Sequence, residues 1–180
     1  MRGFTDNTIT LVFERDAEAS LRQLAKDRFP LKTGGILIGR YTADHSCACV
    51  TEVLPPPPDS KERQDAFTRG IEGLNEILAD RWEADDPTYY LGEWHSRPGK
   101  IGSDLFVAPS AIDIQSMIEF AEDDNFQCPQ PMLVIMGIAT NDLGGPYVKN
   151  IAKMTQTKIG VYGFHRGNTD FVTLEPTRSN

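Results

Sequence analysis

Two short stretches decide the fold of this chain: Gly92-Glu93-Trp94-His95-Ser96-Arg97-Pro98-Gly99 and Pro109-Ser110-Ala111-Ile112-Asp113. The first follows the apolar residues 89–91 and ends in an Arg-Pro-Gly turn signal, which predicts a strand that ends near His95. The second predicts the start of a helix at Ser110, because apolar residues then recur at helical spacing: Ile114, Met117, Ile118 and Ala121. A histidine at a strand end and a carboxylate in the first turn of the next helix can converge on one point, as the ligands of a hydrolytic zinc do.

The segments upstream predict a helix followed by a strand hairpin. A helix capped by Asp16 ends at Arg28-Phe29-Pro30. The stretch Thr33-Gly34-Gly35-Ile36-Leu37-Ile38-Gly39 then leads into a buried strand over 36–41, and residues 47–54 return as its hairpin partner. The tract Pro55 to Pro58 predicts an internal loop at about 55–61. It is not a domain linker, because neither half of the chain would then hold a complete set of strands and helices.

The remaining pattern adds one more helix and a late group of strands. The helix is predicted from about 70 to 83, and strands are predicted over 132–139, 148–154, 159–164 and 171–174. The order predicts a single domain over 1–180 of mixed α/β class, whose later strands are antiparallel.

The composition limits the classes of partner and the cell compartment. The chain has 18 Lys and Arg against 26 Asp and Glu, a formal charge of −8, which argues against nucleic acid as the main partner. Its three cysteines, Cys47, Cys49 and Cys128, are an odd count that favours a reducing compartment. The start shows no signal-peptide core, and the apolar run of residues 132–139 is too short to cross a bilayer. We therefore expect a cytoplasmic protein without a membrane partner.

Together the three motifs resemble the JAMM/MPN (JAB-domain) family of zinc isopeptidases, and most closely its bacterial branch beside ubiquitin-like conjugation and CBASS-type antiphage genes. The resemblance covers roughly residues 15 to 140. It implies a cytidine-deaminase-like α+β fold, with a mixed, largely antiparallel curved sheet flanked by helices. It also implies zinc-dependent hydrolysis of the peptide or isopeptide bond after a ubiquitin-like C-terminus.

The resemblance assigns roles to five positions, of which two depart from the family pattern. His95 and Asp113 fall on zinc ligands, and Ser110 falls on the serine that helps to hold the oxyanion. Arg97 stands where the second zinc-binding histidine is expected, and Lys32 stands where the catalytic glutamate is expected. Arginine offers no lone pair to a metal, and lysine in place of glutamate removes the base for the metal-bound water. We therefore expect zinc to bind weakly or not at all, and Arg97 to bond Asp113 as a bidentate pair instead.

Each motif also has a plainer structural interpretation. Ser110 and Asp113 match a helix capping box, a role that is compatible with the site. Glu93 shares a strand face with His95 and could replace the missing base, but a structural carboxylate is the favoured interpretation. His45, beside Cys47 and Cys49, is assigned to a hairpin turn. The sequence gives His165 no role, although it too is a histidine in a turn.

Three functions remain open on the sequence alone. The first is a catalytically impaired member that acts by binding a ubiquitin-like protein or its conjugate, or a conjugating or activating enzyme. The second is an active zinc isopeptidase, or a deliberately inactivated form of one. The third is a structural subunit with no ubiquitin-like ligand. The identity of the substrate and the oligomeric state are not predicted.

Overall fold

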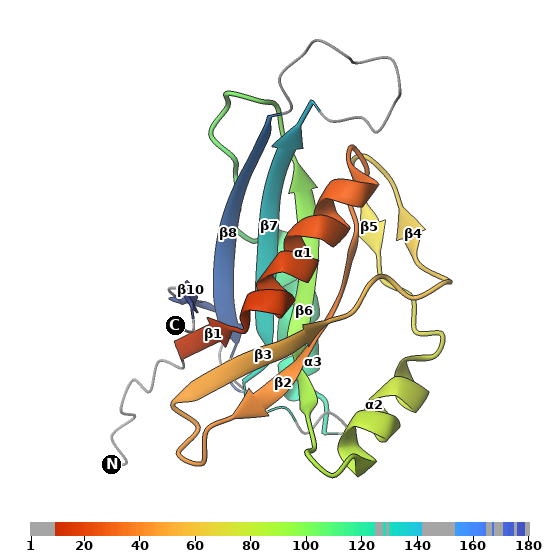
Figure 1. Cartoon of the computed structure of the whole chain (residues 1–180), viewed down its shortest axis with the longest axis vertical. Coiled ribbons are helices and arrows are strands. Elements are labelled where there is room, and N and C mark those ends of the chain that lie inside the picture. The colour runs from red at the N-terminus through yellow and green to blue at the C-terminus, as the bar shows by residue number, and fades with distance from the viewer. Residues whose placement is uncertain are drawn as a thin grey trace.

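The computed structural model describes residues 10–124, 128, 130–141, 154–164, 167, 171–174 and 176–178, and Figure 1 shows its arrangement. The described elements are β1 (Thr10–Phe13), α1 (Arg15–Arg28), β2 (Gly34–Tyr41), β3 (Cys47–Val53), β4 (Lys61–Glu62), β5 (Phe67–Thr68), α2 (Leu74–Glu83), β6 (Tyr89–Pro98), α3 (Ala111–Glu122), β7 (Met132–Thr140), β8 (Thr155–Phe164), β9 (Phe171–Leu174) and β10 (Pro176–Arg178).

One curved sheet forms the centre of the described fold. Its strands lie in the order β10-β1-β3-β2-β6-β7-β8-β9, and β4 and β5 form a separate short ribbon. Four neighbouring pairs of the large sheet are antiparallel, while β10-β1, β1-β3 and β6-β7 are parallel. The predicted α+β class with a mixed, mostly antiparallel sheet is therefore confirmed.

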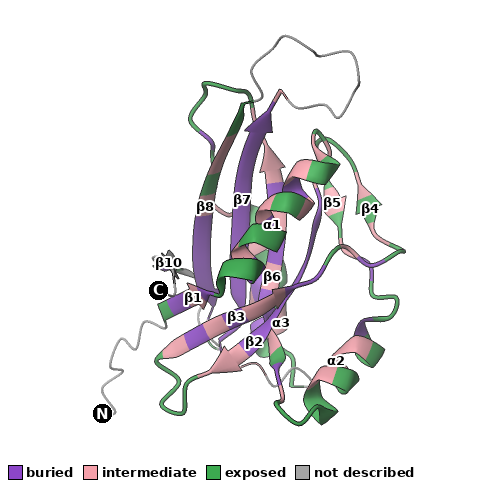
Figure 2. Ribbon diagram, in the orientation of Figure 1, coloured by how far each residue is buried: buried purple, intermediate pink, exposed green. Residues whose placement is uncertain are grey.

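Helices cover both faces of this sheet (Figure 1). Every residue of β7 is buried, and its side chains alternate between two cores (Figure 2). Met132, Val134, Met136 and Ile138 pack with α1, whereas Leu133 and Ile135 pack with α3. A third, smaller core joins α2 to β2. A central strand that is buried on both faces explains why its sequence is continuously apolar.

The helix boundaries agree with most of the sequence predictions. Helix α1 ends at Arg28, and α3 begins at Ala111 with Ser110 as its cap. Helix α2 starts at Leu74 rather than near residue 70, because Asp59 holds the backbone amides of Ile71 and Glu72 at 3.0 Å outside the helix. Within the described ranges, no helix is long and apolar enough to cross a membrane.

The strands show larger differences from the sequence predictions. β2 begins at Gly34, and β6 continues to Pro98 instead of ending near His95, because it pairs with β7 over its whole second half. The short ribbon of β4 and β5 follows the proline loop, and neither it nor β1 and β10 was predicted. Residues 148–153 of one predicted strand lie outside the described residues.

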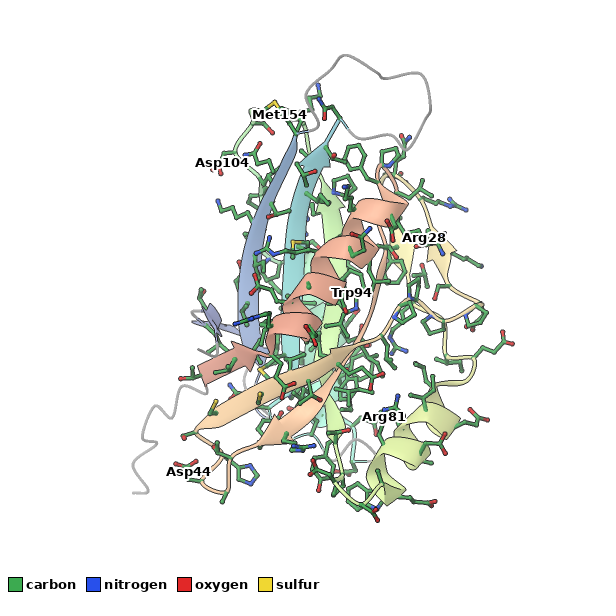
Figure 3. The ribbon with its side chains drawn as sticks, in the orientation of Figure 1. Arg28, Asp44, Arg81, Trp94, Asp104 and Met154 are labelled. Carbon is green, nitrogen blue, oxygen red and sulfur yellow. The ribbon has the colours of Figure 1, made fainter. Side chains whose placement is uncertain are left out.

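The pairing of β2 with β6 brings two of the sequence motifs together. Gly34 lies opposite His95 in this antiparallel pair. A Cβ at Gly34 would meet the Trp94 carbonyl oxygen at 2.4 Å and the Phe67 ring at 2.6 Å, so only glycine fits there. The indole of Trp94 donates to the Leu54 carbonyl at 2.9 Å and anchors this junction at the centre of the molecule (Figure 3).

Candidate functional site

The end of β6 places three charged or polar side chains on the α3 face of the sheet. Trp94 belongs to the core on the α1 face, so alternation along the strand directs Glu93, His95 and Arg97 to the opposite face. The first turn of α3 brings Asp113 to the same face. The convergence that the sequence motifs predicted is therefore present.

His95 and Asp113 face each other at the centre of this site. Nε2 of His95 lies 3.2 Å from Oδ1 of Asp113, and both side chains are largely buried, with 15% and 19% of their surface exposed. The two atoms are close, but their geometry does not align a donor with an acceptor, so Nε2 makes no hydrogen bond. The other ring nitrogen, Nδ1, lies 3.4 Å from the backbone oxygen of Ser96.

Arg97 joins three segments around the carboxylate of Asp113. Its Nη2 lies 3.3 Å from Oδ2 of Asp113, and its Nη1 donates to the carbonyl of Ala108 in the loop before α3. The guanidinium also lies over the ring of Phe106, 5.2 Å from the ring centre. The expected bidentate pair is not formed, because Nη1 bonds the Ala108 carbonyl instead of the second carboxylate oxygen.

Ser110 and Asp113 form the capping box that the sequence predicted. The hydroxyl of Ser110 accepts from the amide of Asp113 at 3.2 Å, and Oδ2 of Asp113 accepts from the amide of Ser110 at 2.7 Å. The hydroxyl of Ser110 also donates to Oδ2 at 2.8 Å. The plainer interpretation of this motif is therefore present at the same place as the site.

The surroundings of Asp113 favour its charged form. Burial alone raises the pKa of Asp113, but the imidazole of His95 and the amide and hydroxyl of Ser110 lower it more. The result is a pKa well below the usual range of an aspartate. Asp113 is therefore a fixed negative charge at neutral pH.

Lys32 lies two residues before β2 and bonds the turn between β4 and β5. Ser96 and Thr33 continue the pairing of β6 and β2, with the Ser96 amide donating to the Thr33 carbonyl at 2.7 Å. One more step of this register puts Lys32 opposite Arg97. The amide of Lys32 donates to the Arg63 carbonyl at 2.7 Å, and its Nζ donates to the Asp65 carbonyl at 2.8 Å.

Glu93 is paired with a cation that the sequence did not suggest. Arg69, just beyond β5, donates from Nε to Oε1 of Glu93 at 2.9 Å, and the two side chains are only 14% and 18% exposed. Burial raises the pKa of Glu93, and the Arg69 guanidinium opposes part of that rise. This ion pair supports the structural interpretation of Glu93 over a role as a replacement base.

The described residues do not fit the zinc of the resembled family. A catalytic zinc takes about three protein ligands and one open position for water. His95 and Asp113 supply two donors, and the neighbouring Arg97, which contacts Asp113, cannot ligate a metal. In the described part of the chain, no group of three or more His, Cys, Asp and Glu side chains is placed to hold a metal ion.

The other metal-friendly residues lie away from this site. His45 occupies the turn between β2 and β3 with a left-handed backbone, φ 55°. Its ring stacks on that of Tyr41, with 5.6 Å between the ring centres. Figure 3 shows that turn, marked by its neighbour Asp44, at the edge of the molecule and far from Trp94. The three cysteines are free thiols. His165 lies outside the described residues.

Comparisons with known proteins point to a curated relative and to solved structures of similar fold. No protein-family model matches the chain. It is 40% identical over 116 residues to the "CD-NTase/cGAS isopeptidase" of Enterobacter hormaechei subsp. hoffmannii, and the match covers 64% of this chain. The match spans only 59% of the length of that relative. The solution structure of a protein from Desulfitobacterium hafniense resembles the fold, with a TM-score of 0.57 and 16% identity over 94% of this chain and 93% of that one.

Proposed function

We propose that this chain is an isopeptidase-like protein of the JAMM/MPN type that binds a ubiquitin-like protein or its conjugate and does not cleave it. The observation that supports the proposal is the contact of Arg97 with Asp113 at 3.3 Å, because arginine offers a metal no lone pair. The relative from Enterobacter, 40% identical over the matched region, supports the isopeptidase-like part.

The charges of the site oppose the hydrolytic chemistry of the family. A unit cation about 4 Å from a divalent ion raises its energy by roughly 8 kcal/mol at an effective dielectric near 20, an upper bound for a flexible side chain. A lysine ammonium carries only N–H donors, so the side chain at position 32 does not supply the base that a glutamate would. Ser110 remains in place, but an oxyanion donor alone does not supply a nucleophile.

The name of the relative suggests where such a binding protein acts. An isopeptidase recognises a chain whose C-terminal carboxyl group is joined to an amine of a second protein. We therefore propose that the partner is a ubiquitin-like protein, free or conjugated to a CD-NTase/cGAS-type protein, or an enzyme of that conjugation.

Restoring the residues that the family pattern expects at positions 32 and 97 tests this proposal. Lys32→Glu with Arg97→His supplies the missing base and ligand, whereas the matched control Lys32→Gln with Arg97→Gln removes both cations and supplies neither. We expect about one zinc per chain in the reverted protein, and cleavage of a ubiquitin-like fusion only there. Cleavage by the unmodified chain that a chelator abolishes would contradict the proposal.

Chelator-sensitive cleavage by the unmodified chain would favour a second candidate function, that of an active zinc isopeptidase. One observation keeps it in view: His95 and Asp113 still present two donors 3.2 Å apart, a separation that two ligands of one tetrahedral metal can adopt. Elemental analysis of the unmodified chain, purified without added metal, separates the two candidates. Zinc at about one atom per chain supports the enzyme, and its absence supports the binding protein.

A further inference from the structure

The hairpin of β2 and β3 carries a second group of metal-binding side chains, the thiols of Cys47 and Cys49. Both lie in a regular part of β3, where Cys47 pairs with Thr10 and Cys49 pairs with Val12 of β1 without a shift of register. Ala48 between them is fully buried in the core that α1 covers, so alternation directs both thiols to the opposite face of the sheet. Figure 2 shows this alternation of buried and half-buried residues along β3. The two thiols are therefore neighbours on one partly exposed surface.

The spacing of the two free cysteines is too wide for a disulfide and suits one bridging ion. Alternate residues of a strand lie about 6.7 Å apart, whereas the Cβ atoms of a disulfide lie about 3.5–4.5 Å apart. Two metal–thiolate bonds of about 2.3 Å on opposite sides of an ion place the sulfur atoms about 4.6 Å apart. The Cβ–Sγ bonds can lean toward each other and span the remainder. A linear, two-coordinate ion therefore fits between Cys47 and Cys49.

A donor set of two thiols selects the kind of ion. A structural zinc takes four protein ligands, and a catalytic zinc takes three. His45 of the same hairpin stacks its ring on Tyr41, and across the described ranges no three His, Cys, Asp or Glu side chains are grouped to hold a metal ion. Cu(I) is a soft ion that thiolate ligands select, and it accepts a linear geometry with two ligands. The pair of thiols therefore suits Cu(I) and not zinc.

The charged neighbours of the two thiols favour a cation that binds sulfur strongly. Burial raises the pKa of both thiols, and the carboxylates of Asp44 and Glu14 raise it further at Cys47 and Cys49 respectively. The guanidinium of Arg40, which is already in an ion pair, opposes part of the rise at Cys49. Both thiols are therefore protonated at neutral pH, and a bound ion has to displace their protons. Two carboxylates against one paired guanidinium attract a cation to this place.

We propose that Cys47 and Cys49 together bind one Cu(I) ion, at a site that is independent of the proposed function. Each sulfur forms a bond to the ion while its thiol proton leaves to the solvent, so two protons are released and no electron is transferred. The resulting bis-thiolate complex carries one negative charge, which Arg40 partly offsets because it lies opposite Cys49 in the pairing of β2 and β3. Both ligands belong to one strand, so the ion binds without a change in the pairing of the sheet.

An anaerobic titration of the reduced full chain with Cu(I) tests the inference, with acetonitrile as a weak competing ligand. We expect about one Cu(I) per monomer, and X-ray absorption should show two sulfur neighbours in a linear geometry. N-ethylmaleimide should label Cys47 and Cys49 in the copper-free chain and spare both in the loaded chain, whereas zinc should give no such protection. No bound copper, three or more ligands, a copper ion shared by two chains, or equal labelling with and without copper overturns the inference.

Three serine variants show which thiols hold the ion. Cys47→Ser and Cys49→Ser each remove one ligand and keep the size of the side chain, so each should weaken Cu(I) binding at least about tenfold. Cys128→Ser is the matched control: its thiol contacts the Tyr41 hydroxyl at 3.4 Å, and its loss should leave copper binding unchanged. Unchanged binding in either single variant, or weakened binding in Cys128→Ser alone, contradicts the inference. If a serine variant does not fold, as judged by circular dichroism, the labelling of the unmodified chain decides.

Discussion

Nη2 of Arg97 lies 3.3 Å from Oδ2 of Asp113, so the guanidinium connects the end of strand β6 to the first turn of helix α3. The carboxylate is 19% exposed and the guanidinium side chain 16% exposed, which makes this contact more sheltered than an ordinary surface ion pair. The guanidinium of Arg97 also contacts the Ala108 carbonyl and the Phe106 ring, which belong to the loop between β6 and α3.

Removing that cation should destabilise the fold. Arg97→Ala removes the guanidinium donor from the Ala108 carbonyl and from the Asp113 carboxylate, which keeps its two bonds from Ser110. We expect a loss of about 1–3 kcal/mol in the free energy of unfolding. Urea unfolding at neutral pH measures it. Arg40→Ala, which breaks the exposed pair with Asp86, serves as the control and should cost less than about 1 kcal/mol. Equal effects of the two variants would show that the Arg97 contacts contribute little.

The pH dependence of stability should reveal the charged Asp113. Its pKa is lowered in the folded chain, so its contribution is complete above the ordinary carboxyl pKa of about 3.9 and disappears as the pH falls toward the lower folded pKa. The difference in unfolding free energy between the native chain and Asp113→Asn should shrink as the pH falls below about 4. A difference that grows on acidification would contradict the lowered pKa.

The close contact at Gly34 predicts a strong steric effect. Gly34→Ala places a Cβ 2.4 Å from the backbone oxygen of Trp94, which cannot move without disturbing the pairing of β2 and β6. We expect a loss of about 2–4 kcal/mol in chemical denaturation. Gly102→Ala is the comparison: nothing lies within 4 Å of its Cβ, and only the left-handed backbone, φ 82°, opposes it, at about 1 kcal/mol.

Zinc should leave the melting temperature of the native chain unchanged, because the guanidinium of Arg97, which has no lone pair for a metal, contacts Asp113 at 3.3 Å. In Lys32→Glu with Arg97→His, zinc at about a hundredfold excess over its Kd should add roughly 2.7 kcal/mol to stability. Differential scanning calorimetry, with zinc and then with a chelator, measures both shifts. A zinc-dependent rise in the native chain would indicate that the site ligates metal after all.

The buried pair of Arg69 and Glu93 should be sensitive to one-sided changes. Glu93→Gln leaves the Arg69 guanidinium without its counter-charge, and we expect about 2–4 kcal/mol of destabilisation in urea unfolding. Arg69→Met together with Glu93→Gln should recover at least about 1 kcal/mol of it, since no unpaired charge then remains. A double variant that is less stable than the single variant would argue against this electrostatic explanation.

Local sequence pattern was sufficient for α1, α3 and the central strands, because their apolar spacing matches their burial. The same pattern predicted that His95 and Asp113 converge, because it placed His95 near the end of a strand and Asp113 in the first turn of the next helix. The pairing of Lys32 with the Asp65 carbonyl and of Arg69 with Glu93 could not be predicted. Both depend on how residues 55–73 fold back over β2 and β6, and no periodic signal marks that path.

The same limit applies to the outer strand β10. Residues 11–13 of β1 pair in parallel with residues 176–178, so partners from distant parts of the sequence lie side by side. Parallel pairing of this kind leaves no turn signal between the strands, and short strands carry little pattern of their own. Propensity alone therefore favours local hairpins, such as β2 with β3, over such distant contacts.

This pairing has a consequence for how the chain acquires its fold during synthesis. On the ribosome, β1 and its neighbour β3 emerge long before residues 176–178 are translated. Until then, the free edge of β1 exposes unpaired backbone amides and carbonyls that a neighbouring nascent chain can pair with. Slow decoding or a stall before residues 176–178 are translated would therefore prolong a state prone to aggregation.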